Sequence, residues 1–388
     1  MPDTAETMSE TSVAADSPLS AEAEALGAVL TEVAGRRVPL HFGDSLAEYR
    51  AVRGAAGVAD RADRAQIRLW GRDPVKMVQG LLTNDLAGAP PGRGVYAAML
   101  TPKGRTIAEL RAFRLARPGG TEVLLDLPRE ALAGTREHLR KFVPPMFARW
   151  ADASEEMGAL GVYGPRSREL VARALAAEVP PLDQDAFTEA PFEDVPVVVA
   201  GTRDAGGEEG FDLLAPAGVL PGLWRALLAA GEGVGARPVG HEALETLRVE
   251  AGVPRYGADL SEETIPTEAF EAIGMVPRAI SFTKGCYTGQ EVIVRIAHRG
   301  HVNRHLRGLR LGGLAAPAPG TPLFHPETGK EVGRITSTAF SPLLGETVAL
   351  GYVRRELGPG DAVRVGSADG ERAGVVGLPF RKGEGDAG

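Results

Sequence analysis

The most informative stretch of this chain reads Lys284-Gly285-Cys286-Tyr287-Thr288-Gly289-Gln290-Glu291. Thr288 and Glu291 have the spacing of a capping box, and the apolar residues that follow recur at helical intervals. A helix is therefore expected to begin here, with Cys286 just ahead of its amino terminus. The helix dipole and Lys284 would both favour a thiolate, so Cys286 is either a reactive thiol or a small thiol that fills a gap in the core.

A basic stretch follows the octapeptide, from Arg295 to Arg310. It contains five arginines and three histidines and no acidic residue. Such a stretch would suit a polyanion, for example a glutamate tail, a nucleotide phosphate or RNA. It could equally be a solvated helix end, where cationic side chains suit the carboxyl-terminal dipole. With no cysteine or carboxylate among the histidines, we expect no dedicated metal site.

Composition narrows the class of protein. The chain has 388 residues, 43 basic against 51 acidic residues, a formal charge of −8, and one cysteine, so neither an internal disulfide nor a thiolate zinc cage is possible. Seven of the acids lie in the first 40 residues, which predicts a disordered acidic tail over residues 1–36 and a nearly neutral body. The start lacks a signal peptide, and no apolar run is long enough for a membrane helix, which indicates a cytoplasmic protein.

The body of the chain has two parts that differ in their pattern of apolar residues and turns. Up to about residue 230, alternating runs and amphipathic runs predict a meander at 95–127, helices at 128–142, 167–177 and 219–230, and strands between them. The second half of this region has the outline of a ferredoxin-like layer. After Val302, six short strands separated by glycine and proline predict a small antiparallel β-barrel. The fold class is therefore α+β.

The octapeptide resembles the signature of the YgfZ family, folate-binding proteins related to the T-protein (aminomethyltransferase) of the glycine cleavage system. Further matching blocks lie at 80–86, 103–105, 247–259 and 264–268, so the resemblance spans residues 39–380. It implies a T-protein-like folate-binding body at 37–146 plus 235–300, interleaved with a ferredoxin-like layer at 147–234. The barrel would occupy 301–381 and a frayed tail 382–388.

The resemblance also implies the site residues. Cys286 and Lys284 would carry the chemistry, and tetrahydrofolate would be the cofactor. The folate contacts would be Arg248, Glu250, Tyr256, Asp212, Asn84 and Tyr96. A pterin edge suits a carboxylate such as Asp212, and a glutamate tail suits arginine.

Two departures from the T-protein pattern shape the expected function. T-proteins carry an acidic pair that works at the folate nitrogen, and this chain has Ala108 and Glu109 there; it also has Cys286 in place of an aspartate. Because a positioned acid contributes about 10²–10⁴-fold, we expect the transferase chemistry to be lost. The main hypothesis is therefore a folate-binding accessory protein for iron–sulfur cluster assembly or repair in client enzymes, including tRNA-modifying ones. The alternatives are a folate-dependent aminomethyl or methyl transferase that uses Glu109, and a tRNA-binding module that uses Arg295–Arg310.

Overall fold

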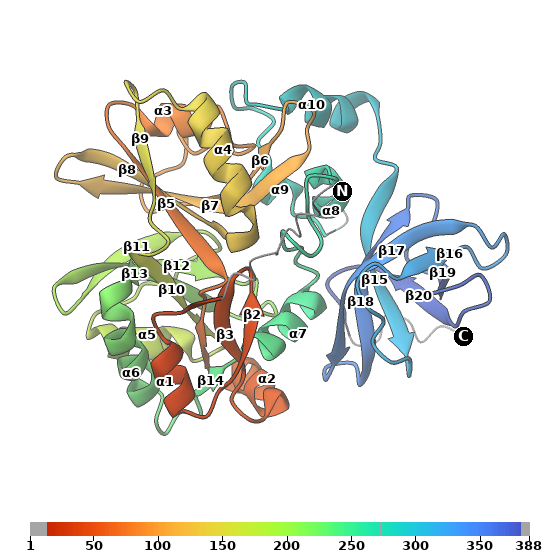
Figure 1. Cartoon of the computed structure of the whole chain (residues 1–388), viewed down its shortest axis with the longest axis horizontal. Coiled ribbons are helices and arrows are strands. Elements are labelled where there is room, and N and C mark those ends of the chain that lie inside the picture. The colour runs from red at the N-terminus through yellow and green to blue at the C-terminus, as the bar shows by residue number, and fades with distance from the viewer. Residues whose placement is uncertain (1–13, 272, 382–388) are drawn as a thin grey trace, which may run out of the picture.

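A computed structural model describes residues 14–271 and 273–381, and Figure 1 shows their arrangement. Two sheets lie together on one side of the molecule, and a closed barrel lies on the other, joined to them by a helical segment. The predicted α+β class with a small antiparallel barrel at the carboxyl-terminal end is confirmed. No helix in the described ranges is long and apolar enough to cross a membrane.

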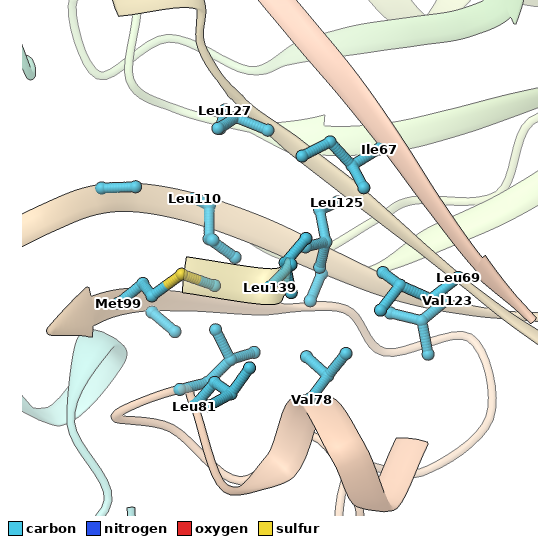
Figure 2. Close-up of a cluster of buried hydrophobic side chains, with 14 of the residues drawn as sticks. Ile67, Leu69, Val78, Leu81, Met99, Leu110, Val123, Leu125, Leu127 and Leu139 are labelled. Carbon is cyan, nitrogen blue, oxygen red and sulfur yellow. The ribbon is translucent and has the colours of Figure 1, made fainter. Parts of the chain in front are cut away.

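The first sheet has the strand order β6-β7-β8-β5-β9. Its strands are β5 (Arg64–Trp70), β6 (Val95–Leu100), β7 (Thr106–Arg117), β8 (Gly120–Pro128) and β9 (Arg149–Asp152). One face packs against α3 (Pro74–Gln79) and α4 (Leu132–Phe142). Figure 2 shows Val78 and Leu81 pointing toward Met99, Leu110 and Leu125 in this core. On the strands, the apolar side chains of this core recur at every second position, because successive side chains of a strand point to opposite faces.

The second sheet has the order β11-β12-β13-β10-β4-β14, and only its β14–β4 pair is parallel. Its strands are β4 (Gly57–Asp60), β10 (Met157–Tyr163), β11 (Phe187–Phe192), β12 (Val195–Thr202), β13 (Gly210–Pro216) and β14 (Arg237–Val239). One face is covered by α5 (Ser167–Leu175) and α6 (Leu220–Ala230) around the buried Trp224. Strands β4 and β14 come from outside residues 147–234, so the layer draws on more of the chain than the ferredoxin-like outline suggested.

The uncovered faces of the two sheets pack against each other at one end. Phe113, Leu115 and Leu124 of the first sheet meet Val198 and Leu214 of the second in a small buried cluster. Moving two residues at a time along β7 and β13 from this cluster, the same faces become polar at Arg111, Glu109 and Asp212. The change from apolar to polar along one face therefore leaves a polar cleft beside the packed end.

The remaining elements join the sheets to the barrel. They are α7 (His241–Ala251), α8 (Pro266–Phe270), α9 (Val276–Ala279) and α10 (Gln290–Arg299). The barrel strands are β15 (Arg304–Gly312), β16 (Pro322–Phe324), β17 (Glu331–Ser341), β18 (Glu346–Arg354), β19 (Ala362–Val365) and β20 (Arg372–Val376). In Figure 1, α10 lies between the five-stranded sheet and the barrel. α7 contacts strands of the barrel directly.

The amino-terminal expectation needs correction. Residues 1–13 and 382–388 lie outside the described residues, but residues 14–36, expected to be disordered, form β1 (Ala15–Asp16), α1 (Ser20–Ala25), β2 (Val29–Val33) and the start of β3 (Arg36–His41). Next comes α2 (Ser45–Gly54). Leu19 and Ala23 are buried, and the Ser17 hydroxyl donates to Asp60 at 2.5 Å. The high average charge of this segment concealed the few apolar residues that dock it.

Candidate functional site

The polar cleft between the sheets is the strongest candidate for a functional site. Its interior leaves about 100 Å³ for water-sized molecules, and the cleft opens to solvent at its mouth. Its walls carry five arginines and five carboxylates: Arg61, Arg64, Arg111, Arg248, Arg255, Asp63, Glu109, Asp204, Asp212 and Glu245. Such a balanced cluster favours a polar ligand with both hydrogen-bond donors and acceptors.

The floor of the cleft is an ion network centred on Arg111. Its Nη2 donates to Asp126 at 2.8 Å and lies 2.7 Å from Asp212 Oδ2. Tyr163 donates its hydroxyl to the other oxygen of Asp212 at 2.5 Å. Burial would raise the pKa of Asp126, but Arg64 and Arg111 outweigh it and lower that pKa. Asp212, expected to bind the edge of a pterin, thus already has a protein partner at each oxygen, a hydrogen bond from Tyr163 at one and an ion pair with Arg111 at the other.

One donor of this network remains open. Nη1 of Arg111 is buried and has no hydrogen-bond partner, although the residue lines the cleft. Burying a guanidinium N–H without an acceptor costs free energy. A carbonyl or carboxylate oxygen of a bound ligand, or a water, would satisfy it.

Glu109 occupies the cleft side of β7. It pairs with Ala98 across the β6–β7 ladder, on the face that also carries Tyr96 and Arg111. Its neighbour Ala108 points the opposite way, into the apolar core beneath the sheet. Burial raises the pKa of Glu109, Arg64 opposes that change, and Asp204 adds to it.

The structure brings only some of the sequence-predicted site residues together. Tyr96, Asp212 and Arg248 line the cleft with Glu109. Asn84 lies behind Tyr96 and donates its amide to the Tyr96 carbonyl at 2.9 Å. Tyr256 approaches the site through its backbone N–H, which donates to the Glu109 carboxylate. These placements leave the folate contacts themselves as predictions.

Glu250 lies away from the cleft, at the joint between α2, α7 and the barrel. It accepts hydrogen bonds from Tyr49 at 2.7 Å, Arg53 at 2.5 Å and Ser341 at 2.5 Å. Its side chain is 1% exposed. Every carboxylate oxygen is therefore occupied by a protein donor, and the position of Glu250 suits docking of the barrel.

Cys286 and Lys284 do not form a pair in the structure. Cys286 is exposed, so it does not fill a gap in the core. The Lys284 ammonium is buried and donates to three backbone carbonyls, those of Gln79 and Leu82 at 2.6 Å and Asn84 at 2.9 Å. Neither residue is among the described residues that line the cleft. Lys284 therefore anchors the 79–84 segment through its ammonium group.

The expected capping box at Thr288 and Glu291 is wrong. The helix begins at Gln290, its N-cap is Gly289 in a left-handed conformation with φ 82°, and no side chain caps it. A Cβ at Gly289 would lie 2.7 Å from the Thr101 carbonyl oxygen. Close approach of two backbones, which the local spacing does not reveal, therefore determines where α10 starts.

Gly289→Ala is expected to lower the free energy of unfolding by about 1–3 kcal/mol, because alanine is strained at this φ and meets the Thr101 backbone. Urea titration followed by circular dichroism measures this loss. Gly285→Ala is the matched control, since nothing lies within 4 Å of a Cβ there and its φ needs no glycine. Equal stability of the two variants would contradict the role given to Gly289.

The basic stretch Arg295–Arg310 is partly neutralised. Arg304 stacks over the Tyr352 ring at 4.5 Å and lies 3.3 Å from Glu268, and Arg310 pairs with Glu346. Arg299, at the end of α10, is exposed. None of the described residues of this stretch lines the cleft, so tRNA contact through it stays a prediction. Across residues 14–271 and 273–381, no three His, Cys, Asp or Glu side chains are placed to hold a metal ion.

Sequence reasoning missed most of the charged cleft residues. Among them are Arg61, Asp63, Arg64, Arg111 and Asp204. A signal did exist: Arg111 and Asp126 each lie between two apolar neighbours in a strand, and a charge at such a position needs a partner or a cleft.

The chain is similar to known proteins over most of its length. Residues 19–274 match the GCVT N-terminal domain, and residues 304–382 match the glycine cleavage T-protein C-terminal barrel domain. An aminomethyltransferase from Moorella thermoacetica is 32% identical over 94% of this chain and 96% of its own length. One from Frankia alni is 33% identical over 90% and 92%.

The fold is likewise similar to a solved structure. The glycine cleavage system aminomethyltransferase T from Bartonella henselae superimposes with a TM-score of 0.83 at 24% identity, over 95% of this chain and 98% of that one. At this identity the likeness concerns the fold alone. The T-protein-like architecture expected from the octapeptide is thereby confirmed.

Proposed function

Because the chain belongs to the glycine cleavage T-protein family, we propose that it is a folate-dependent aminomethyltransferase whose cleft between the two sheets binds tetrahydrofolate. The observation that carries the proposal is Glu109, a buried carboxyl on the cleft wall with a raised pKa. A buried carboxyl whose pKa is raised is suited to exchanging a proton with a bound ligand.

The expected accessory role in iron–sulfur cluster assembly is wrong. Relatives that are 32% identical over 94% of the chain carry the name aminomethyltransferase, which favours the alternative that was set aside. The resemblance to YgfZ proteins located the T-protein-like fold correctly, but these relatives do not support the finer assignment. The exposed Cys286 outside the cleft gives that assignment no support either.

The direction of side chains on β7 bears on the absence of one acid at position 108, which was the main argument against transferase activity. The sequence argument treated Ala108 as the loss of one acid from the working pair. Ala108 packs in the core and Glu109 faces the cleft, since neighbours on a strand point to opposite sides. An alanine at position 108 therefore leaves the carboxyl that faces a ligand in place.

The residues of the cleft fit a reduced folate. Arg111 offers a buried N–H with no partner, which suits an oxo group of the ligand, and Tyr96 offers an aromatic wall. Bound folate would supply the acceptor nitrogen for the one-carbon unit. Glu109 would hold or move a proton at its carboxyl oxygen, and the paired sheets would limit the access of water.

An assay of aminomethyl transfer tests the proposal. The full chain is incubated with tetrahydrofolate and an S-aminomethyl thioether, and ammonia release is followed. We expect release that requires both the protein and tetrahydrofolate. Binding of tetrahydrofolate is measured in parallel by calorimetry, and tight binding without any transfer from such donors would overturn the assignment as a transferase.

A further inference from the structure

The cleft wall opposite Glu109 carries a second carboxylate, Asp204. It follows β12 in the six-stranded sheet and lines the same cleft. Arg278 of α9 grips it with two hydrogen bonds, from Nη1 at 2.8 Å and from Nη2 at 3.1 Å. A bidentate grip of this kind fixes the orientation of a carboxylate as well as its charge.

Arg278 also holds two further groups. It donates to both oxygens of Asp185, at 2.7 and 2.8 Å, and its guanidinium lies 4.4 Å from the centre of the Tyr96 ring. Asp185 and Asp204 belong to the side of the six-stranded sheet, whereas Tyr96 belongs to the five-stranded sheet. One arginine therefore ties the two walls of the cleft together.

The backbone of Arg278 is fixed as well. Its carbonyl accepts a hydrogen bond from the Asn84 amide at 2.7 Å, and the same amide donates to the Tyr96 carbonyl. Thr83 donates its hydroxyl to the next carbonyl, that of Ala279, at 2.7 Å. The polar Thr83-Asn84 pair thus sets the position of the arginine.

The charges around Glu109 come from several elements. Arg64 on β5 favours its ionised form, while Asp126 on β8 and Asp204 disfavour it; Tyr96 on β6 and the Tyr256 N–H complete the surroundings. Burial would raise the pKa of Asp204, but Arg278 outweighs it and keeps that pKa low. Surroundings that raise the pKa of one carboxyl group and lower that of its neighbour are typical of a site with one proton-exchanging acid and one ionised carboxylate.

We propose that Asp204 supplies the second carboxylate of the site from the opposite wall, and that Arg278 is the positioning residue that fixes it beside Glu109 and Tyr96. The inference rests on the proposed function for its catalytic meaning. The adjacent acidic pair of the T-protein pattern is replaced here by two carboxyl groups that come from different sheets. The charge of Asp204 adds to the effect of burial in raising the pKa of Glu109, while Arg278 keeps the pKa of Asp204 low.

Direct titration of Glu109 tests this without any turnover. Carbon-13 NMR of the full chain with labelled glutamate, assigned with Glu109→Gln, gives the midpoint of its carboxyl signal. Asp204→Asn is expected to lower that midpoint by about one pH unit, because it removes a like charge. Asp185→Asn is the matched control, since Arg278 grips it equally but it is not among the described cleft residues; we expect no shift.

Arg278→Lys provides a second variant should Asp204→Asn fail to fold. Lysine cannot bridge two carboxylates with paired donors, so Asp204 is released and the Glu109 midpoint is again expected to fall. An unchanged midpoint in Asp204→Asn, or the same shift in Asp185→Asn, would overturn the inference. A shifted midpoint in a protein with no transferase activity would overturn the proposed function and leave the carboxylate pair standing.

Discussion

Glu109→Gln is expected to lower kcat for aminomethyl transfer by about 10²–10⁴-fold, the usual contribution of a positioned acid or base. Glutamine keeps the size of the side chain and can still accept a hydrogen bond from the Tyr256 N–H. It cannot exchange a proton. The fold and the dissociation constant for tetrahydrofolate should therefore change little, and the loss should appear in single-turnover rates.

Glu122→Gln is the matched control for this experiment. Glu122 is another buried glutamate of the same sheet, paired with Arg68 at 2.6 Å, and it does not belong to the cleft lining. We expect this variant to retain kcat. Glu109→Asp keeps the acid but shortens its reach, so an intermediate rate is expected. A Glu109→Gln protein as fast as the wild type would show that the proton moves through another group.

The strands and the barrel were predictable because they follow a strong local rule. The meander expected at 95–127 contains β6, β7 and β8, and the six short strands expected after Val302 form the barrel. Alternation between apolar and polar residues, broken by glycine and proline turns, decides such elements locally. Strand β5 was not predicted, because its arginines and Gln66 are typical of a surface loop. In the structure, Arg64 and Gln66 donate hydrogen bonds to the buried Asp126.

The site was less predictable because its geometry depends on the pairing of two sheets. Alternation along β7 could have shown that Ala108 and Glu109 face opposite ways, so this error was avoidable. That Glu109 and Asp204 line the same cleft could not be predicted, since it depends on how residues nearly a hundred positions apart pack. The same holds for α10, where the approach of Gly289 to Thr101 sets the start of the helix.

We expect the largest loss of stability from a substitution where the barrel docks onto the rest of the protein. Asp259 is completely buried and accepts hydrogen bonds from Arg248 at 2.6 Å, Thr336 at 2.5 Å and Ser337 at 2.8 Å. Its backbone carbonyl accepts another from Tyr352 at 3.0 Å. One carboxylate thus links the cleft residue Arg248 to two hydroxyls of β17.

Asp259→Ala is expected to lower the free energy of unfolding by about 3–5 kcal/mol, because it leaves the buried Arg248 with one acidic partner fewer and the Ser337 hydroxyl without its acceptor, while Thr336 keeps only the Leu350 carbonyl. Urea titration measures the loss. Glu331→Ala is the control, since its pair with Arg334 is exposed at 3.5 Å and should contribute at most about 1 kcal/mol. Because Arg248 also lines the cleft, tetrahydrofolate binding should weaken in the Asp259 variant under conditions where it remains folded. A loss no larger than that of the control would mean that apolar packing alone docks the barrel.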